Sequence, residues 1–302
     1  MSSIRLLAIG EVMAEIRSQD DGFAVGFAGD TYNTAIYAAR QLGAPGQVGY
    51  VTRLGDEPLS QALLAHALAE GLDVSHIARD PQRNIGIYAV VTDDDGERSF
   101  SYWRADSAAR RLFAAGQAAP VLPAAEIVYL SGITLAILAP AGRVRLLEML
   151  ADLRAGGATK VAFDSNYRPA LWEDRATARK TMEQIWQLTD IALPSIDDEM
   201  ALYGDDSEEA VVARFAARDW DGIAIKRGSR GPLSPRLAAD DRPDFPAAMK
   251  VVDTTAAGDS FNGGYLAAFI AGKGEAARLA AGHALAARVV GVPGAILPRE
   301  AD

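Results

Sequence analysis

The sequence contains no cysteine, which excludes disulfide bonds, thiolate nucleophiles and zinc sites built on cysteine. Its three histidines, His66, His76 and His283, are scattered without the spacing of a metal site. Basic residues are fewer than acidic ones, 30 Lys and Arg against 40 Asp and Glu, and the net charge of -10 argues against a general nucleic-acid binder. An anionic substrate would therefore need arginines placed locally around it.

The sequence also lacks a hydrophobic run long enough to cross a bilayer. The most apolar stretch, AARLAAGHALAARVVGV, is interrupted by Arg278, His283 and Arg288, so it lacks the ~20 consecutive apolar residues that a span requires. The opening MSSIRLLAIGEV leads directly into the polar EVMAEIRSQDD without a small-residue cleavage site, which indicates a strand and not a signal peptide. We expect a protein of the reducing cytoplasm with no membrane partner.

What the sequence does contain is a regular alternation of two patterns. With 302 residues and 49% hydrophobic content, the chain is long enough to bury a large core. Short, fully apolar runs alternate with longer helical patterns, as in KVAFDSN followed by ARKTMEQIWQLT. This alternation is typical of parallel βαβ units, whose strands are covered by helices on both faces. We therefore predict an α/β fold with a doubly wound, mostly parallel sheet flanked by helices.

Two segments depart from this alternation. Residues 11–28 have the pattern of short strands around Asp20-Asp21-Gly22, and residues 85–104 have the pattern of a hairpin that turns at Asp95-Gly96. We expect these segments to form a small β lid, and the alternative is an antiparallel edge of the main sheet. Because the exposed edges of a lid could be covered by a second subunit, we also expect a homo-oligomer. The predicted α/β core then consists of residues 1–10, 29–84 and 105–302.

The stretch DTTAAGDSF, residues 253–261, begins a helix with unusually small side chains. Ala256, Ala257 and Gly258 leave the free N–H groups of the first turn open, and these groups favour an anion. Asp259 lies within reach of a hydroxyl beside that anion and could accept its proton as the oxygen attacks a γ-phosphate. The alternative is that Asp259 only caps the helix. Asp253 has the same alternative of a capping role, and we expect it instead to shape the loop or to contribute to a cation site.

Two other stretches have features that a kinase needs. GFAGDTYN, residues 26–33, places Gly29 and Asp30 at a helix start and Asn33 one turn later, which suits polyol hydroxyls; the alternative is a plainly capped helix. IKRGSRG, residues 225–231, follows a strand and offers glycines and Lys226 to nucleotide phosphates. No Walker A motif G-x-x-x-x-G-K-[ST] occurs in the sequence, so nucleotide binding would be of another type.

Over its whole length the chain resembles the ribokinase-like (PfkB) family of carbohydrate kinases. The resemblance rests on the N-terminal AIGE strand, the Gly-Asp-x-x-Asn helix start, the lid and the C-terminal DTTAAGDSF. The usual signature of the family is D-T-x-G-A-G-D, and Ala256 replaces its first glycine here. The stretches GERSFSYWRADSAAR, YLSGITLAIL, FDSNYRPALW, IDDEMALYG and GAILPRE are similar to the members that phosphorylate 2-keto-3-deoxygluconate.

This resemblance implies transfer of the ATP γ-phosphoryl group to the 6-hydroxyl of that sugar acid, which gives 2-keto-3-deoxy-6-phosphogluconate. Because the substrate is a carboxylate, Arg104 on the lid could hold it through the planar fork of its guanidinium. Tyr88 and Tyr102 would supply hydroxyls and ring faces. Arg168 resembles a family residue that contacts the substrate or the transferred phosphoryl. The alternatives are a solvated lid arginine for Arg104 and a surface ion pair for Arg168.

The resemblance also implies an ATP site and a magnesium ion, held largely through ATP phosphates and water. The N-x-x-E pair of the family corresponds to PSIDDE, with Ser195 and Asp198 in its places and Glu199 adjacent. The residue that organises the metal through water is therefore either Asp198 or Glu199, and a monovalent cation is expected near Asp253. The implied ATP contacts are Asn166, Arg168, Ser195, Lys226, Gly228, Ser229, Gly231, Ala257, Gly258 and His283.

Two rival functions stay open at this point. A kinase of a neutral sugar, a fructokinase or a ribokinase, would have no use for Arg104 as a carboxylate ligand. A non-catalytic sensor of sugar acids would keep the fold without phosphoryl transfer. The sequence also does not distinguish the gluconate-derived from the galactonate-derived epimer, because such a choice depends on the placement of a single hydroxyl.

Overall fold

The computed structural model describes residues 4–19, 22–92, 98–116, 120 and 122–299. Its centre is a six-stranded sheet with the order β12-β11-β10-β9-β1-β4, in which all neighbouring strands are parallel. The predicted doubly wound α/β fold is thus confirmed. The strands are β1 (Leu6–Ile9), β4 (Val48–Val51), β9 (Ile127–Ser131), β10 (Lys160–Asp164), β11 (Ile191–Ala192) and β12 (Gly222–Ile223).

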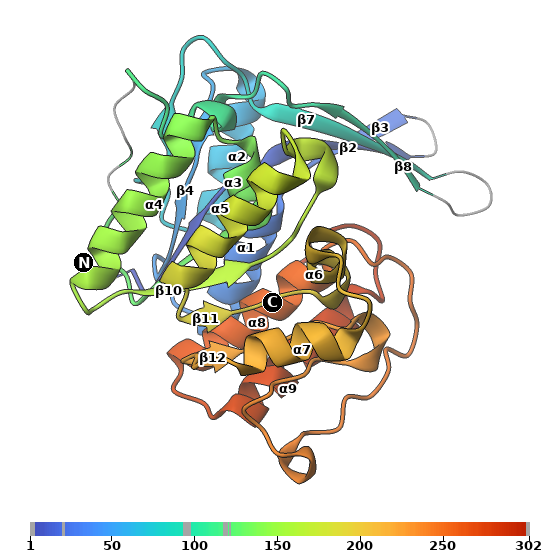
Figure 1. Ribbon diagram of the computed structural model, residues 1–302. Helices are drawn as coiled ribbons and strands as arrows, with labels where there is room; N and C mark the ends of the chain where they lie inside the picture. The colour runs from blue at the N-terminus through green and yellow to red at the C-terminus, as the bar shows by residue number, and fades with distance from the viewer. Residues whose placement is uncertain (1–3, 20–21, 93–97, 117–119, 121, 300–302) are drawn as a thin grey trace.

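The sheet is buried on both faces because successive residues of each strand point to opposite sides. Leu7 and Ile9 belong to one core cluster and Leu6 and Ala8 to the other, and the remaining long strands divide in the same way. Fully burying one such Leu or Ile contributes ~1.5–3 kcal/mol. Two helical layers cover the sheet (Figure 1).

The first layer consists of α3 (Gly132–Ile137), α4 (Pro140–Ala155), α5 (Arg175–Leu188), α6 (Ile196–Tyr203) and α7 (Glu208–Ala216). The second layer consists of α1 (Asp30–Leu42), α2 (Pro58–Ala69), α8 (Ala257–Ile270) and α9 (Glu275–Val289). Four 3-10 turns and a small pair of strands complete the described chain: η1 (Ala108–Arg111), η2 (Pro169–Leu171), η3 (Gly228–Arg230), η4 (Ala239–Asp241), β5 (Arg53–Leu54) and β6 (Ala78–Arg79). No helix in these described segments combines the length and the apolar character that crossing a bilayer needs.

A second sheet stands away from the α/β body (Figure 1). It has the order β3-β2-β7-β8, and within the described residues none of its strands pairs with the six-stranded sheet, so the edge-strand alternative is wrong. β2 pairs with β7 in parallel, and the other two pairs are antiparallel. The two expected turns, at Asp20-Asp21 and at Asp95-Gly96, lie outside the described residues. The strands are β2 (Met13–Gln19), β3 (Gly22–Ala28), β7 (Gly86–Thr92) and β8 (Arg98–Trp103).

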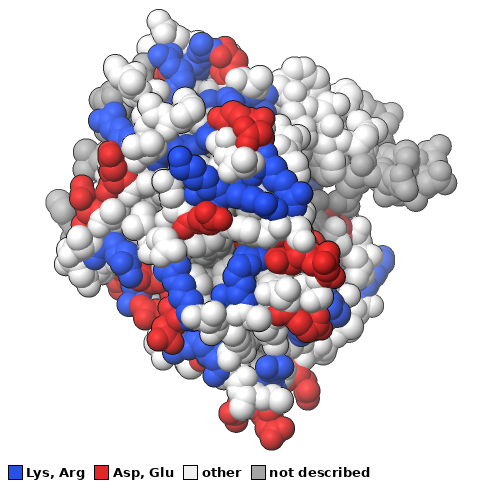
Figure 2. Space-filling model, viewed as in Figure 1, with Lys and Arg blue, Asp and Glu red and all other residues white. Residues whose placement is uncertain are grey.

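The two faces of this lid sheet have different surroundings. On the inner face, Met13, Ala28 and Tyr88 pack with Ala295 from the C-terminal segment. The outer face carries exposed apolar side chains, namely Phe23, Val25, Val91 and Trp103. In Figure 2 the described part of the projecting sheet is white, whereas basic and acidic side chains are mixed over the body.

Candidate active site

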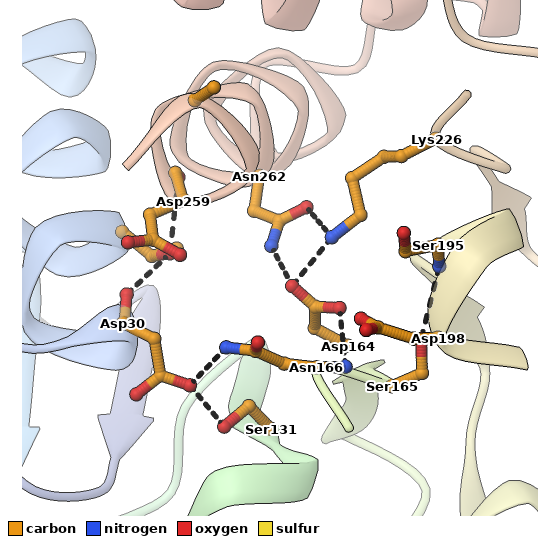
Figure 3. Close-up of polar contacts among 12 residues, drawn as sticks. Asp30, Ser131, Asp164, Ser165, Asn166, Ser195, Asp198, Lys226, Asp259 and Asn262 are labelled. Atoms are coloured by element: carbon orange, nitrogen blue, oxygen red, sulfur yellow. Dashed lines mark hydrogen bonds and ion pairs between the residues drawn. The ribbon is translucent and has the colours of Figure 1, made fainter. Parts of the chain in front are cut away.

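The candidate site lies where the carboxyl ends of β9 and β10 meet the N-termini of α1 and α8 (Figure 3). The two helices approach closely because Gly263 has no side chain: a Cβ there would lie 2.9 Å from the Thr34 carbonyl oxygen and 3.1 Å from the Ala38 nitrogen. This contact brings Asn33 of α1 to Asp259 of α8, and Asn33 Nδ2 donates to Asp259 Oδ2 at 2.8 Å. Residues that are distant in the sequence therefore share one site.

Asp259 is not the cap of α8. The N-cap is Ala256, no side chain caps this helix, and the carboxylate of Asp259 is instead held by Asn33. Burial and the nearby carboxylates of Asp30 and Asp164 raise the pKa of Asp259 to about 7. A carboxylate with that pKa is suited to accept a proton near neutral pH.

The loop before α8 presents backbone amides. Ala256 adopts a left-handed conformation with φ 60° and ψ 15°. The Ala257 N–H donates to the Thr254 carbonyl at 3.2 Å, and the first amide that donates to Ala256 is that of Ser260 at 2.8 Å. The N–H groups of Gly258 and Asp259 have no intrahelical acceptor, because no helical residue lies four positions before them. Of the expected anion donors Ala256, Ala257 and Gly258, the Ala257 N–H thus has an acceptor in the loop, whereas the Gly258 N–H, like that of Asp259, has none within the helix.

Asp253 shapes this loop. Its Oδ1 accepts a hydrogen bond from the Thr255 N–H at 2.7 Å, and its Oδ2 accepts one from the Gly294 N–H at 2.6 Å. Asp253 is buried, with 5% of the residue exposed. The loop is therefore tied to the C-terminal segment that also packs on the inner face of the lid.

Asp30 provides a second carboxylate at the start of α1. It accepts hydrogen bonds at Oδ2 from Asn166 Nδ2 at 2.8 Å and from the Ser131 hydroxyl (Figure 3). The N-cap of α1 is Gly29, which has no side chain, and no side-chain hydrogen bond caps this helix. The alternative that residues 26–33 only form a capped helix start is therefore wrong. Burial, partly offset by the hydrogen bond from Ser131, raises the pKa of Asp30.

Asp164 is a third carboxylate of the site, and the sequence motifs did not predict it. Its Oδ2 accepts from Lys226 Nζ at 2.6 Å and from Asn262 Nδ2 at 2.6 Å, and its Oδ1 accepts from the Asn166 N–H at 3.1 Å (Figure 3). Asp164 thus connects Asn166, which holds Asp30, with Lys226. The signal was present in FDSN, where an acidic side chain ends a strand of a parallel sheet.

A cavity of about 330 Å³ adjoins Lys226 and the start of α8. Its walls are largely apolar, with Phe261, Ala286 and Val290 among the lining residues. Such walls suit a planar base, while Lys226 and the open amides at one end suit phosphates. Of the predicted ATP contacts, the cavity is lined by Lys226, Gly228, Ser229, Ala257, Gly258 and His283.

The remaining predicted ATP contacts do not line this cavity. Gly231 packs closely against Phe245: a Cβ at Gly231 would lie 2.8 Å from the Phe245 ring. Asp30, Asp164 and Asp259 together are called the carboxylate cluster. Ser195 lies at the edge of this cluster: it is the N-cap of α6, and its N–H donates to the Ser165 hydroxyl at 3.0 Å (Figure 3). His283, in contrast, does line the cavity, and its Nε2 also contacts the Pro246 carbonyl oxygen at 2.8 Å.

The two metal candidates point in different directions. Asp198 pairs with Arg168 at 3.1 Å and faces the carboxylate cluster, and burial raises its pKa. Glu199 is completely buried and pairs with Arg214 at 2.6 Å, and burial raises its pKa to about 7. The Arg168 side chain is half-exposed, and its pair with Asp198 agrees with the alternative interpretation of Arg168 as a member of a surface ion pair.

On the lid, the predicted substrate residues have partners of their own. Tyr88 donates from its hydroxyl to Glu15 Oε1 at 2.7 Å and stacks on Tyr102, with ring centroids 5.9 Å apart. Arg104 is paired with Glu11, and its side chain is 11% exposed. The interpretation of Arg104 as a solvated lid arginine is therefore wrong.

Comparison with known proteins identifies the relatives of the chain. Residues 4–302 match the sequence profile of the pfkB family of carbohydrate kinases. The chain is 41% identical over 307 residues to the 2-dehydro-3-deoxygluconokinase of Escherichia coli (strain K12), with 99% of each chain covered. It is 38% identical over 309 residues to the 2-dehydro-3-deoxygluconokinase of Dickeya dadantii (strain 3937), with 100% of this chain and 99% of that one covered.

Solved structures share the fold. The chain is similar to an Escherichia coli protein described as a ribokinase II and crystallised with ATP and Mg²⁺, with a TM-score of 0.82 and 22% identity. The similarity covers 97% of this chain and 94% of the other. The overall fold of this chain is thus shared with that structure.

Proposed function

The chain belongs to the pfkB family of carbohydrate kinases, and we propose that it transfers the γ-phosphoryl group of ATP to the 6-hydroxyl of 2-keto-3-deoxygluconate. The full-length relatives that are named 2-dehydro-3-deoxygluconokinase, a synonym of this activity, support the substrate. The observation that carries the reaction is Asp259: a carboxylate with a raised pKa at a helix start with open amides, next to a nucleotide-sized cavity.

The proposed chemistry follows from the positions of these groups. The Asp259 carboxylate accepts the proton of the 6-hydroxyl while the oxygen of that hydroxyl forms a bond to the γ-phosphorus. The bond between the γ-phosphorus and the β–γ bridging oxygen breaks, and ADP leaves with that oxygen. The N–H groups of Gly258 and Asp259, together with Lys226, stabilise the negative charge on the transferring group.

Within the described residues no three acidic or histidine side chains gather as a direct metal site, so a magnesium ion beside the proposed phosphate site would be held largely through water and ATP phosphates. Asp164 and Asp198 lie close enough that the charge of Asp164 contributes to the raised pKa of Asp198. Carboxylates that bind through water, with ATP phosphates as the direct ligands, match the preference of Mg²⁺ for oxygen and for retained waters. The bound ion would neutralise phosphate charge. Because Glu199 is enclosed with Arg214, Asp198 is the residue that we propose as organiser of this site.

The lid supplies the substrate end of the site. Arg104 would take the carboxylate of the sugar acid, and Tyr88 and Tyr102 would pack against its carbon chain. Asp30, Asn33 and Gly29 would bind its hydroxyls from the start of α1. We infer that substrate binding draws the lid toward the body and excludes water, so that transfer to the sugar outcompetes hydrolysis of ATP.

One set of rate measurements tests this function against its rivals. ADP formation is followed with 2-keto-3-deoxygluconate, its galactonate-derived epimer, fructose and ribose as acceptors. We expect the highest kcat/KM with one of the two sugar acids. A preference for fructose or ribose would identify a neutral-sugar kinase, and binding of the sugar acid without ADP formation would identify a sensor.

Three further properties belong to this proposal. The exposed apolar outer face of the lid supports a homo-oligomer, which sedimentation analysis measures.

Both oxygens of Asp253 accept amide hydrogen bonds, so a monovalent cation there would be held by loop carbonyl groups. A comparison of activity in potassium and in choline salts tests for this cation. Dependence on ATP supports a cytoplasmic location, which fractionation of the source cells checks.

A further inference from the structure

We propose that Glu11 is a positioning residue, which holds the Arg104 guanidinium in place for the carboxylate of the sugar acid. This inference rests on the proposed function, in which Arg104 is the carboxylate ligand. Glu11 is almost completely buried, with 1% of its side chain exposed, and its Oε2 pairs with Arg104 Nη2. Its other oxygen, Oε1, accepts a hydrogen bond from the Ser107 hydroxyl at 2.5 Å.

Glu11 lies where the lid joins the body. The chain leaves β1, passes through Glu11 and enters β2, and it returns from β3 at Gly29. A Cβ on Gly29 would lie 2.3 Å from the Glu11 carbonyl oxygen, so the outgoing and returning segments touch. A Cβ on Gly86, at the start of β7, would lie 3.0 Å from Glu11 Oε1 and 3.3 Å from Arg104 Cβ. The carboxylate is thus enclosed by the segments that connect lid and body.

The guanidinium keeps donors for a ligand while Glu11 holds it. Arginine has five N–H donors. Within the described residues, the Arg104 guanidinium makes one hydrogen bond, to Glu11, and its buried Nε has no partner. A buried donor without a partner costs ~1–3 kcal/mol, so a ligand that supplies an acceptor is favoured there. A carboxylate is the acceptor that the planar fork of a guanidinium matches best.

The pairing also limits the freedom of a long side chain. An arginine that must hold a carboxylate loses less rotamer entropy on binding if its orientation is set in advance. Tyr102 borders the same guanidinium, with Arg104 Cζ 6.0 Å from its ring centroid. The contacts with Glu11 and Tyr102 thus orient the guanidinium before the substrate arrives.

Two substitutions at Glu11 separate orientation from charge. Glu11→Asp keeps the charge and withdraws the carboxylate by one methylene from both Arg104 and Ser107. We expect it to raise KM for 2-keto-3-deoxygluconate by about tenfold, within the range of coupling between contacting residues, with kcat and KM for ATP within about threefold of wild type. Glu11→Gln keeps the shape and removes the charge, and we expect a smaller rise in KM.

A double-mutant cycle with Arg104→Met identifies how Glu11 acts. If it acts through Arg104, Glu11→Asp changes KM for the sugar acid in the wild-type background and leaves it unchanged in the Arg104→Met background. If the effect of Glu11→Asp persists undiminished in that background, Glu11 has a merely structural role and the inference is overturned. Ser107→Ala, which removes the other partner of the carboxylate, provides an independent variant if Glu11→Asp does not fold.

The control and the outcomes separate this inference from the proposed function. Glu70 is a matched control, because it is also buried and paired with an arginine, Arg40, at 2.8 Å, and Arg40 lies in the last turn of α1. Glu70→Asp should leave KM for the sugar acid unchanged. An unchanged KM in Arg104→Met would contradict the proposed role of Arg104 itself. A raised KM in Arg104→Met, with wild-type KM in both Glu11→Asp and Ser107→Ala, would overturn the positioning role alone.

Discussion

Asn33 and Asp259, which are 226 positions apart in the chain, share a hydrogen bond of 2.8 Å across the contact between α1 and α8. The bond fixes one oxygen of the Asp259 carboxylate and leaves the other oxygen for a proton. It also joins the helix that would bind the sugar hydroxyls to the helix that would bind the phosphates. The orientation of the proposed base is therefore set by packing between two helices.

Replacing Asp259 by Asn tests the proposed base. The amide can keep the contact with Asn33 but cannot accept the hydroxyl proton, so kcat should fall at least ~10²-fold. KM for ATP and the circular dichroism spectrum should stay close to those of wild type. A variant that retains a third or more of wild-type kcat in steady-state assays would remove Asp259 from this role.

The pH dependence of activity follows from the raised pKa of Asp259. Burial and the neighbouring Asp30 raise this pKa to about 7, and the base works only when it is deprotonated. We expect kcat/KM to decrease with falling pH below about pH 7, measured in buffers of constant ionic strength. A profile that is flat from pH 5.5 to pH 8 would contradict this prediction.

The same pKa has the opposite consequence for stability. The pKa of Asp259 is higher in the folded protein than in the unfolded chain, so its contribution to folding is present at low pH and is lost as pH rises through about 7. Asp259→Asn should therefore unfold at a higher temperature than wild type at pH 8, and the difference should shrink at pH 5. Equal melting temperatures at pH 8 would show that burial does not destabilise the carboxylate.

Gly258→Ala tests the open backbone of the loop. A Cβ at Gly258 would lie 3.7 Å from Lys226 Nζ, an ordinary contact, so the fold should be preserved. The methyl group would occupy space on the wall of the nucleotide cavity, and we expect KM for ATP to rise by about tenfold, a loss of ~1.4 kcal/mol of binding. Gly274→Ala is the control, because Gly274 also begins a helix and has nothing within 4 Å. Equal KM values in the two variants would contradict the prediction.

Ala256→Gly tests the backbone conformation at the start of α8. The left-handed conformation of Ala256, with φ 60°, costs an alanine about 1–2 kcal/mol and a glycine very little. Glycine loses more entropy on folding, which offsets part of this gain. We expect the free energy of unfolding in urea to increase by up to ~1 kcal/mol, and Ala256→Val to decrease it. A destabilised Ala256→Gly variant would show that the alanine is not strained.

Lys226→Met tests the ion pair with Asp164. Both side chains are mostly buried, with 13% and 4% exposed, so the variant leaves a buried carboxylate without its cation. We expect the free energy of unfolding to fall by ~3–5 kcal/mol at pH 7 and kcat to fall as well. The double variant Lys226→Met/Asp164→Asn should recover most of the stability and none of the activity. Recovery of both would mean that Lys226 has only a structural role.

Several features of this protein could be predicted from short stretches of sequence. Apolar runs that alternate with helical patterns predicted the parallel sheet, because a strand buried on both faces needs nothing but apolar residues. The small residues of DTTAAGDSF predicted an open helix start, because the free amides belong to the backbone of that stretch itself. Properties of this kind depend on neighbours in the chain, and they were sufficient to indicate the family.

The partners of each side chain required the tertiary structure. Asp198 and Glu199 are adjacent in the sequence, but successive residues on a helix point ~100° apart, so one faces the carboxylate cluster and the other is enclosed with Arg214. Asp164 meets Lys226, and Glu11 meets Arg104, only because strands and helices bring their ends together. The sequence by itself determined which chemical groups are present and which backbone is open. Packing decided which groups are paired and which pKa values are raised, because both depend on side chains from distant segments.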